Sequence, residues 1–377
     1  MKIPNREFRP NPDRGIFVNA AIDQDLLDRL TPRIVALQAS SRDPISIFID
    51  SPGGSTLTAS ALGSLLRVSN QDCAAPCRII TVVTSTAASA AADLLSSGDY
   101  AIAYPDSTVF YHGVRTTPAS PVTREVAAEL SQYLTVRNES YALALARRSI
   151  SRIIFLYLVL RSEYTAHRAS INSNKSDFEC FLDLLPGKLG PVGAKLVKQA
   201  RDKNAQHDVL ITQVSRTAFK KKSFLNATRA ADREAILIKA LVDFELKSNR
   251  AESWTFRKDG LARIAEDFLL LIEFGQRRRD DHIIHLCNRW ADYFLTRSDK
   301  EELATIPEPE KQEWMLDRLR PQLQPLWFFC VSLCQALQEG ENELTAEEAY
   351  WLGLLDEVIG AGHIPNMRVL VESQPGG

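Results

Sequence analysis

The sequence predicts an α/β fold with parallel strands, followed by a region that is almost entirely helical. Three short apolar segments, 45–49, 78–84 and 108–111, have the composition of buried strands and alternate with stretches of helical character. From residue 122 onward, apolar residues instead recur at three- and four-residue spacing. Strands and helices that alternate over a short span are typical of parallel α/β domains.

A helix with a clear apolar face follows the first predicted strand, Gly15–Val18. Asp23 or Asp25 is placed to cap this helix, and Pro32 is expected to kink it or to mark a break. The residues that share its apolar face are Leu26, Leu27, Leu30, Ile34 and Leu37. The other elements predicted before residue 112 are helices over 55–68 and 89–97 and a strand over 100–103.

The middle of the chain differs from both ends. Lysine is absent between Lys2 and Lys175 and again after Lys311. Residues 122–148 are predicted as one long helix, and the apolar run 153–160 as the continuation of a buried helix. Further helices are predicted over 230–247, 260–274 and 280–295, with a linker at 306–310.

Composition favours a soluble, cytoplasmic protein without a cofactor. The apolar fraction is 45% and the charged fraction 24%, which is ordinary for a globular chain. Run 153–160 is far too short to cross a bilayer, and the first residues lack the apolar stretch of a signal peptide. We therefore expect no membrane association.

No metal or nucleic-acid site is predicted. The two CxxxC pairs lack zinc-knuckle spacing, and His282 and His285 are interpreted as half-buried packing residues. The basic triplets 220–222 and 277–279 are interpreted as solvated surface. No phosphate-binding loop is present, so any ATP-driven step has to come from a partner.

The groups that follow the three central strands suggest acyl-transfer chemistry. Segment 45–49 leads into Ser51-Pro52-Gly53-Gly54, segment 78–84 leads to Ser89, and segment 108–111 ends at His112. A serine at a strand-to-helix junction lies where free N–H groups and the helix dipole favour negative charge. We predict Ser89 as nucleophile and His112 as general base, with the N–H groups of Gly54 and Ala90 as an oxyanion hole. Taken singly, each piece is also compatible with a turn, a packing serine or a surface histidine.

Residues 15–148 resemble the proteolytic subunit of the Clp protease. The matching residues are Gly15–Val18, Asp50-Ser51-Pro52-Gly53-Gly54-Ser55, Ala87-Ala88-Ser89, Gly98, Tyr104-Pro105-Asp106-Ser107 and His112. The resemblance resumes at Leu344-Thr345-Ala346-Glu347-Glu348-Ala349 and at Gly353–Ile359. It covers roughly half of the chain.

This resemblance implies a Clp/crotonase-type β-β-α superhelix carrying a large all-α insertion. Residues 1–148 and 325–377 would form the peptidase core, and residues 149–324 the α-helical insertion domain. By position, the resemblance implies Glu341 as the acid that orients His112, and Asn342 is the alternative third residue. It further implies a homo-oligomer that cleaves peptides or unfolded protein through an acyl-enzyme on Ser89, with an ATP-driven unfoldase as a possible partner.

The insertion bears on assembly. The long helix 122–148 matches the handle that joins two rings in the family, and the insertion stands between this helix and Glu341. We therefore expect a smaller oligomer or a single ring instead of the family's double ring of seven plus seven, with the helical domain restricting entry to the site.

Three other interpretations remain open. A signal-peptide peptidase of this fold uses a Ser–Lys dyad, but the matching segments contain no lysine. A crotonase acting on acyl-CoA shares the oxyanion hole but needs no Ser–His pair. A degenerate Clp-like subunit would act as a structural or regulatory binding module, and labelling of Ser89 by a fluorophosphonate separates it from an active hydrolase.

Overall fold

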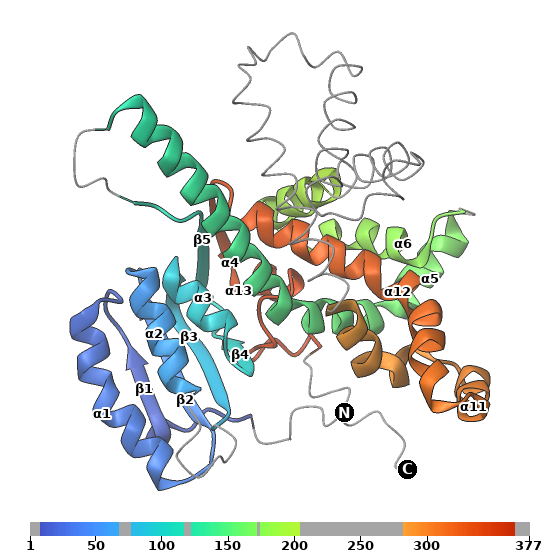
Figure 1. Ribbon diagram of the computed structural model, residues 1–377, viewed down its shortest axis with the longest axis horizontal. Helices are drawn as coiled ribbons and strands as arrows, with labels where there is room; N and C mark the ends of the chain where they lie inside the picture. Colours follow the sequence, from blue (N-terminus) through green and yellow to red (C-terminus); the bar gives the residue numbers. More distant parts are fainter. Residues whose placement is uncertain (1–7, 68–76, 117–121, 172–173, 204–281, 366–377) are drawn as a thin grey trace, which may run out of the picture. The chain divides into compact units, whose positions relative to one another are not determined.

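The structure is a computed structural model that describes residues 8–67, 77–116, 122–171, 174–203 and 282–365 (Figure 1). The chain divides into two compact units, residues 1–200 with 325–377, and residues 201–324. The helices predicted over 230–247 and 260–274, and both basic triplets, lie outside the described residues.

A mixed sheet forms the centre of the first unit. Its order is β1-β2-β3-β4-β7, while β5 pairs with β3 and with β6. All pairs are parallel except β5 with β6, which are antiparallel. The strands are β1 (Gly15–Val18), β2 (Ile45–Ser51), β3 (Ile79–Ala88), β4 (Tyr100–Ala103), β5 (Thr108–His112), β6 (Glu341–Thr345) and β7 (Glu357–Val358).

Strand β3 forks the sheet. Residues 80–83 pair with β4, whereas residues 86–88 pair with β5. The predicted strand at 78–84 is therefore longer than its apolar run, because small residues continue it to Ala88. As a result, β3 delivers the next residue, Ser89, directly beside β5.

Four helices pack against one another in chain order: α1 (Gln24–Ser40), α2 (Thr56–Leu66), α3 (Ala90–Ser96) and α4 (Arg124–Val159) (Figure 1). The Asp23 carboxylate caps α1 by accepting from the N–H of Leu26 at 2.9 Å. Pro32 lies inside α1 without ending it. The burial of Ile16, Val18 and Ile49 shows that one face of β1 and β2 is covered.

Helix α4 joins the predicted helix over 122–148 to the predicted buried run at 153–160. It runs without interruption from Arg124 to Val159, so the expected domain boundary at 148/149 falls inside it. The apolar run is confirmed as buried helix, since Ile153, Ile154 and Phe155 are almost wholly inaccessible. Residues 149–159 thus pack as part of the first unit.

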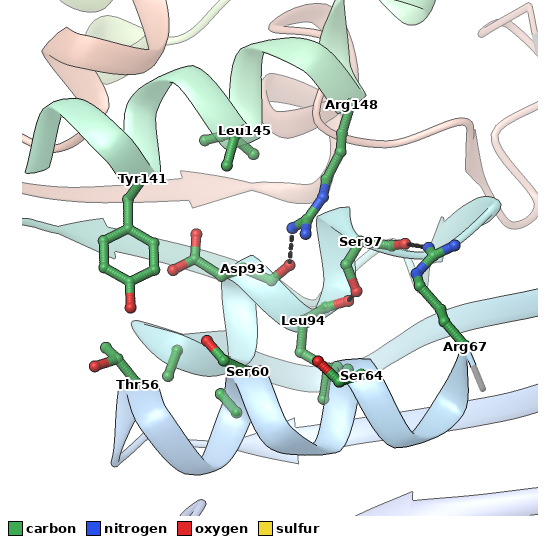
Figure 2. Close-up of a pocket in the computed structure, with 14 residues that line it drawn as sticks. Thr56, Ser60, Ser64, Arg67, Asp93, Leu94, Ser97, Tyr141, Leu145 and Arg148 are labelled. Atoms are coloured by element: carbon green, nitrogen blue, oxygen red, sulfur yellow. Dashed lines mark hydrogen bonds between the residues drawn. The ribbon is translucent and has the colours of Figure 1, made fainter. Parts of the chain in front are cut away.

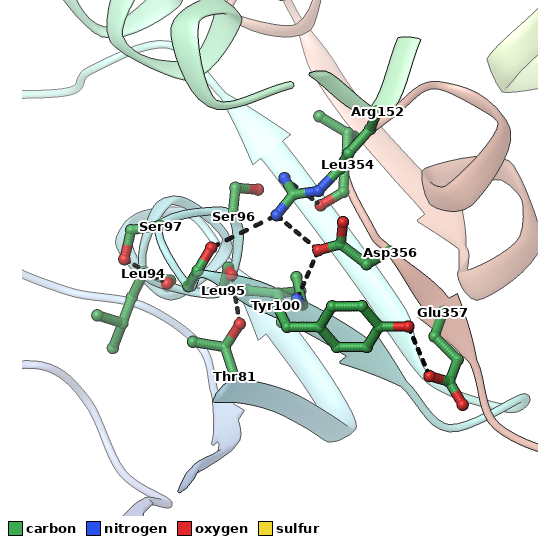
Figure 3. A network of polar contacts seen from close by, with 12 residues as sticks. Thr81, Leu94, Leu95, Ser96, Ser97, Tyr100, Arg152, Leu354, Asp356 and Glu357 are labelled. Carbon is green, nitrogen blue, oxygen red and sulfur yellow. Dashed lines mark hydrogen bonds and ion pairs between the residues drawn. The ribbon is translucent and has the colours of Figure 1, made fainter. Parts of the chain in front are cut away.

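A buried ion pair ties α4 to the end of the sheet (Figure 3). Arg152 and Asp356 lie 2.8 Å apart, with side chains that are 6% and 4% exposed. Arg152 also donates to the carbonyls of Leu354 and Gly98, and Asp356 accepts from the N–H of Ala101. Because every charge has partners, the pair tolerates burial and holds β7 beside β4.

Residues 191–203 and 282–294 are also helical, and the second of these stretches corresponds to the helix predicted over 280–295. The other elements with both ends among the described residues are η1 (Pro12–Arg14), α5 (Arg161–Ser170), α6 (Asp177–Leu184), η2 (Leu185–Lys188), α11 (Arg297–Thr305), α12 (Glu308–Leu337) and α13 (Ala346–Trp351). The predicted linker at 306–310 is short, since only Ile306 and Pro307 separate α11 from α12. None of the helices in the described ranges is long and apolar enough to cross a membrane.

Candidate active site

Ser89 occupies the turn between β3 and α3 in an unusual backbone conformation. Its φ is +55° and its ψ −124°, and it is the one non-glycine residue with positive φ in the part of the chain that the structure describes. Such a conformation costs about 1–3 kcal/mol and is found mainly at functional sites. The Ser89 side chain makes no capping bond to α3. A strained turn that presents an uncommitted hydroxyl at a helix N-terminus is the arrangement of a nucleophile elbow.

Two glycines bring backbone close to Ser89. Gly53 has a φ of +90°, and a Cβ there would lie 2.4 Å from the Ala88 carbonyl oxygen and 2.7 Å from the Ser89 Cβ. Gly54 has a φ of +150°, and a Cβ there would meet the Ile22 carbonyl oxygen at 2.5 Å. No other residue type fits either position, so the loop can pass this close to Ser89 only with glycine.

Ile22 fixes the orientation of this loop. Its N–H donates to the Gly53 carbonyl and its carbonyl accepts from the Ser55 N–H, both at 2.8 Å. In such a parallel bridge, Gly54 keeps its own N–H turned away from Ile22. Ala90 is the first residue of α3, so its N–H has no intrahelical acceptor. The N–H groups of Gly54 and Ala90 are thus two backbone donors near Ser89 that have no acceptor in these elements.

Strand β5 brings His112 to the same place. The Ser89 N–H donates to the Phe110 carbonyl at 2.8 Å, and the Tyr111 hydroxyl bonds with Ser96 Oγ at 2.5 Å and donates to the Ala92 carbonyl at 3.1 Å. These contacts lock β5 against both ends of α3. The half-buried His112 ring lies 2.6 Å through Nδ1 from the Gly113 carbonyl oxygen. Because a carbonyl only accepts, this contact places the proton of the neutral imidazole on Nδ1, and Nε2 is then the nitrogen with the lone pair.

Glu341 is the direct partner of His112 in the antiparallel ladder between β5 and β6. Opposite residues project to the same face, so both side chains leave the sheet on one side. In this structure, however, the Glu341 carboxylate pairs with Arg115 at 2.5 Å, and both side chains are about two-thirds exposed. His112 Nδ1 therefore contacts the Gly113 carbonyl, whereas Glu341 lies on the neighbouring strand and points its carboxylate to Arg115.

Asn342 lies on the other face of β6. It is opposite the buried Tyr111, and its side chain is 3% exposed. Its amide donates to the carbonyls of Ala336, Leu337 and Glu339 and so satisfies the end of α12. Since neighbouring residues of a strand face opposite ways, Asn342 does not face His112.

A cavity of about 300 Å³ gathers the predicted residues Gly54, Ser89, Ala90 and His112. It also contains side chains that the sequence did not single out, namely Asp93 of α3 and three residues of α4, Tyr133, Arg137 and Tyr141. Glu341 does not line it. The cavity therefore brings together four of the five predicted site residues and adds a wall from α4.

Asp93 stands out because of its charge. It lies one helical turn after Ser89 and is half-buried. Burial raises the pKa of its carboxyl to about 7, against the opposing attraction of Arg148. Arg148 donates to the backbone carbonyl of Asp93 at 3.5 Å, while the carboxylate points toward Tyr141 (Figure 2). The sequence analysis did not identify Asp93; its only local signal is that it is an acid in an otherwise small, apolar helix start.

No metal centre is formed by the described residues: no three His, Cys, Asp or Glu side chains cluster among them. The site instead contains a hydroxyl, an imidazole, two backbone donors and one carboxylate around a cavity. These groups are of the kinds that acyl transfer requires, namely a nucleophile, a general base and donors for an oxyanion.

Comparisons with known proteins find similarity to one family. Residues 9–144 match the family model described as Clp protease. The ATP-dependent Clp protease proteolytic subunit 1 of Cutibacterium acnes is 33% identical over 103 residues, which are 26% of this chain and 45% of that protein. The ATP-dependent Clp protease proteolytic subunit 2 of Corynebacterium glutamicum is 30% identical over 135 residues, 34% of this chain and 61% of that protein.

A third relative, the ATP-dependent Clp protease proteolytic subunit 1 of Corynebacterium jeikeium, is 30% identical over 135 residues, 34% of this chain and 65% of that protein. The matches thus span between 45% and 65% of the length of these relatives. The predicted fold class is confirmed by the family match, and the sheet with its flanking helices is consistent with it. The segment of this chain at residues 9–144, which holds Gly54, Ser89, Ala90 and His112, is therefore similar to the Clp protease family.

Proposed function

We propose that this protein is a serine peptidase of the Clp type that cleaves peptides or unfolded protein through an acyl-enzyme on Ser89. The observation that carries the proposal is the strained backbone of Ser89, with φ at +55°, in a cavity shared with His112 and Gly54. Strain of this kind is maintained only where the surroundings impose it. A serine that merely packed α3 against the sheet would gain nothing from it.

In the proposed reaction, Ser89 Oγ attacks the carbonyl carbon of a peptide bond while its proton passes to His112 Nε2. The bond between Nδ1 and the Gly113 carbonyl supports the tautomer that this step needs. The developing oxyanion accepts from the N–H groups of Gly54 and Ala90. As the C–N bond breaks, Nε2 returns the proton to the leaving amine, and water then hydrolyses the ester by the same route.

Glu341 is proposed as the orienting acid in this scheme. Its place opposite His112 supports the role, because directly opposite residues of an antiparallel pair project to the same face of the sheet. In the present arrangement the Gly113 carbonyl already holds Nδ1. Glu341 would therefore orient His112 together with this carbonyl and stabilise the imidazolium that forms in the reaction.

The similarity to the Clp protease family also supports a proposal about assembly. We expect a homo-oligomer that receives its substrates from an ATP-driven unfoldase. We propose that residues 149–324 are inserted between the two parts of the peptidase core, with residues 149–159 continuing α4 in the first unit. The compact units themselves divide at 200/201 and 324/325.

Chemical labelling tests the activity. The full chain is treated with a small fluorophosphonate probe and assayed on a short fluorogenic peptide, beside the Ser89→Ala and His112→Ala variants. We expect labelling at Ser89 alone, no turnover in Ser89→Ala and a loss of several orders of magnitude in His112→Ala. An unlabelled Ser89, or wild-type turnover in Ser89→Ala, would instead indicate a degenerate subunit or a different mechanism.

A further inference from the structure

A second cavity adjoins the one that contains Ser89. It measures about 310 Å³ and lies between α2, α3 and α4 (Figure 2). The two cavities share the lining residues Thr56, Ala90, Asp93 and Tyr141, so they meet at the start of α3. A single liquid water occupies about 30 Å³, and the second cavity therefore has room for a long amino-acid side chain.

The position of this cavity relative to the proposed reaction indicates what enters it. An acyl group on Ser89 would place its oxygen at the N–H groups of Gly54 and Ala90. Ala90 lines the second cavity as well as the first. The side chain of the residue that acylates Ser89 thus has this adjoining space directly beside it.

The lining of the cavity is polar at the end nearest Ser89. Thr56 and Ser60 on α2 contribute hydroxyls, and Tyr141 on α4 contributes its phenol (Figure 2). Asp93 contributes the only carboxylate among the described lining residues. A side chain that enters from Ser89 meets this carboxylate within one helical turn, about 6 Å along α3.

The Asp93 carboxylate has no hydrogen bond or ion pair of its own among the described residues. The guanidinium of Arg148 bonds the backbone carbonyl of Asp93, and Figure 2 shows the carboxylate turned the other way, toward Tyr141. The other arginine of the cavity, Arg67, is taken up by Asp99 and the Ser97 carbonyl. The Asp93 carboxylate therefore faces the space near Ser89 without a hydrogen-bonded or ion-paired partner among the described residues, although Arg148 attracts it.

We propose that Asp93 determines specificity: its carboxylate pairs with a lysine or arginine side chain on the acyl side of the bond that Ser89 attacks. The inference rests on the proposed function. A half-buried carboxylate gains most from a partner that brings an opposite charge and N–H donors together. An apolar side chain of equal length would leave it desolvated and unpaired, which penalises that substrate.

The experiment uses substrates that differ in charge but hardly in shape. Two pairs of fluorogenic peptides are compared, one with arginine or citrulline and one with lysine or norleucine before the scissile bond. We expect kcat/KM for the charged member to exceed that of the neutral one by about tenfold to a hundredfold. Asp93→Asn should bring both ratios close to one, because the amide keeps the shape and removes the charge.

Asp106→Asn is the matched control, since Asp106 is exposed and lines neither cavity. This variant should keep the wild-type ratios. Labelling of Ser89 by a small uncharged fluorophosphonate is measured in the same preparation and reports the proposed function independently of charge preference.

The outcomes separate the two proposals. A wild-type chain that takes the label but prefers neither member of each pair, or an Asp93→Asn variant that keeps the preference, overturns the role of Asp93 alone. A wild-type chain that neither takes the label nor cuts any of the four peptides overturns the proposed function and this inference with it.

Discussion

Two properties of Ser89 favour different residue types. The proposed reaction needs its hydroxyl, whereas its φ of +55° is adopted without cost only by glycine, which has no side chain. Glycine would relieve the backbone strain, and serine keeps it. The conformation was not foreseeable from Ala-Ala-Ser-Ala-Ala, which is compatible with an unremarkable helix start. It arises from the fork in β3 and from the contact with Gly53, both of which involve residues distant in sequence.

Replacement of Ser89 separates strain from chemistry. Ser89→Gly and Ser89→Ala both lack the nucleophile and should both be inactive. We expect Ser89→Gly to be more stable than Ser89→Ala by about 1 kcal/mol, because only glycine adopts this φ without cost. Urea denaturation of both variants, with m-values compared, measures the difference. Equal stabilities would mean that the positive φ carries no strain.

Asp93 should make substrate preference depend on pH. Burial raises the pKa of its carboxyl to about 7, so the charge that attracts a cation appears as pH rises through this value. We expect the arginine-to-citrulline ratio of kcat/KM to grow from pH 6 to pH 8 and to stay flat in Asp93→Asn. The charged or titratable groups that face the two cavities from other elements are Arg67, Tyr111, His112, Arg115, Tyr133, Arg137, Tyr141 and Arg148.

The same group affects stability in the opposite direction. Its pKa of about 7 in the folded chain lies above the ordinary value of 3.8, so the folded state holds this proton more tightly. Its contribution is therefore fully present below about pH 4 and is lost as pH rises toward 7. The melting temperature of Asp93→Asn relative to the wild type should rise across this range. Thermal scans in matched buffers measure it, and a constant difference would place Asp93 at an ordinary pKa.

Glu341 provides a graded test of the third residue. Glu341→Gln should lower kcat far less than loss of Ser89 and leave KM nearly unchanged, because the Gly113 carbonyl still holds His112 Nδ1. Asn342→Ala is the contrasting variant: it removes bonds to the end of α12 and should lower stability. A collapse of kcat in Glu341→Gln would show that Glu341, and not the carbonyl, orients the imidazole.

Helix α4 supplies side chains to the cavity and to the core whose roles its sequence pattern did not predict. Its first part supplies Tyr133, Arg137 and Tyr141 to the cavity, and its second part supplies the buried Arg152. The sequence predicted a helix over 122–148 and a buried continuation, but nothing local specified which face meets α3. That choice depends on packing between elements far apart in the chain.

The strands and turns were more predictable than the site they form. The apolar runs predicted the bounds of β2 and β4 to within two residues. Places after strands singled out Gly53, Gly54, Ser89 and His112. Asp93 was missed because a single acid near a helix start usually favours the dipole and has no further role. Its unpaired charge becomes apparent only when α2 and α4 close the cavity around it.

The ion pair between α4 and the end of the sheet gives an element-scale prediction. Arg152→Met leaves Asp356 buried without a counter-charge and should cost about 3–5 kcal/mol in the free energy of unfolding. Arg297→Gln, which breaks an exposed pair with Glu301, should change little. Chemical denaturation compares the two. Similar small effects in both would mean that Arg152 does not hold the sheet edge in place.

For the whole molecule, the last part of α12 bears on assembly. Cys330 Sγ lies 3.5 Å from the Ala146 carbonyl, and Gln335 donates to Glu139 at 2.8 Å. Part of the surface of α4 is thus covered by the chain itself. We therefore expect an assembly smaller than the double ring of seven plus seven. Native mass spectrometry of the full chain measures it, and a fourteen-subunit particle would contradict the expectation.

The antiparallel pair β5–β6 has a consequence for the order of events during synthesis. Arg115 and Glu341, which meet beside the site, are 226 positions apart, and Ala101 and Asp356 are 255 apart. At about 5–20 residues per second, a ribosome needs roughly ten to fifty seconds to cover that interval. For this time Ser89 and His112 already exist, but β4 and β5 lack their outer neighbours. The proposed nucleophile and base are therefore synthesised well before the strands that complete the sheet around them, so we expect this part of the sheet to form only after β6 and β7 have been made.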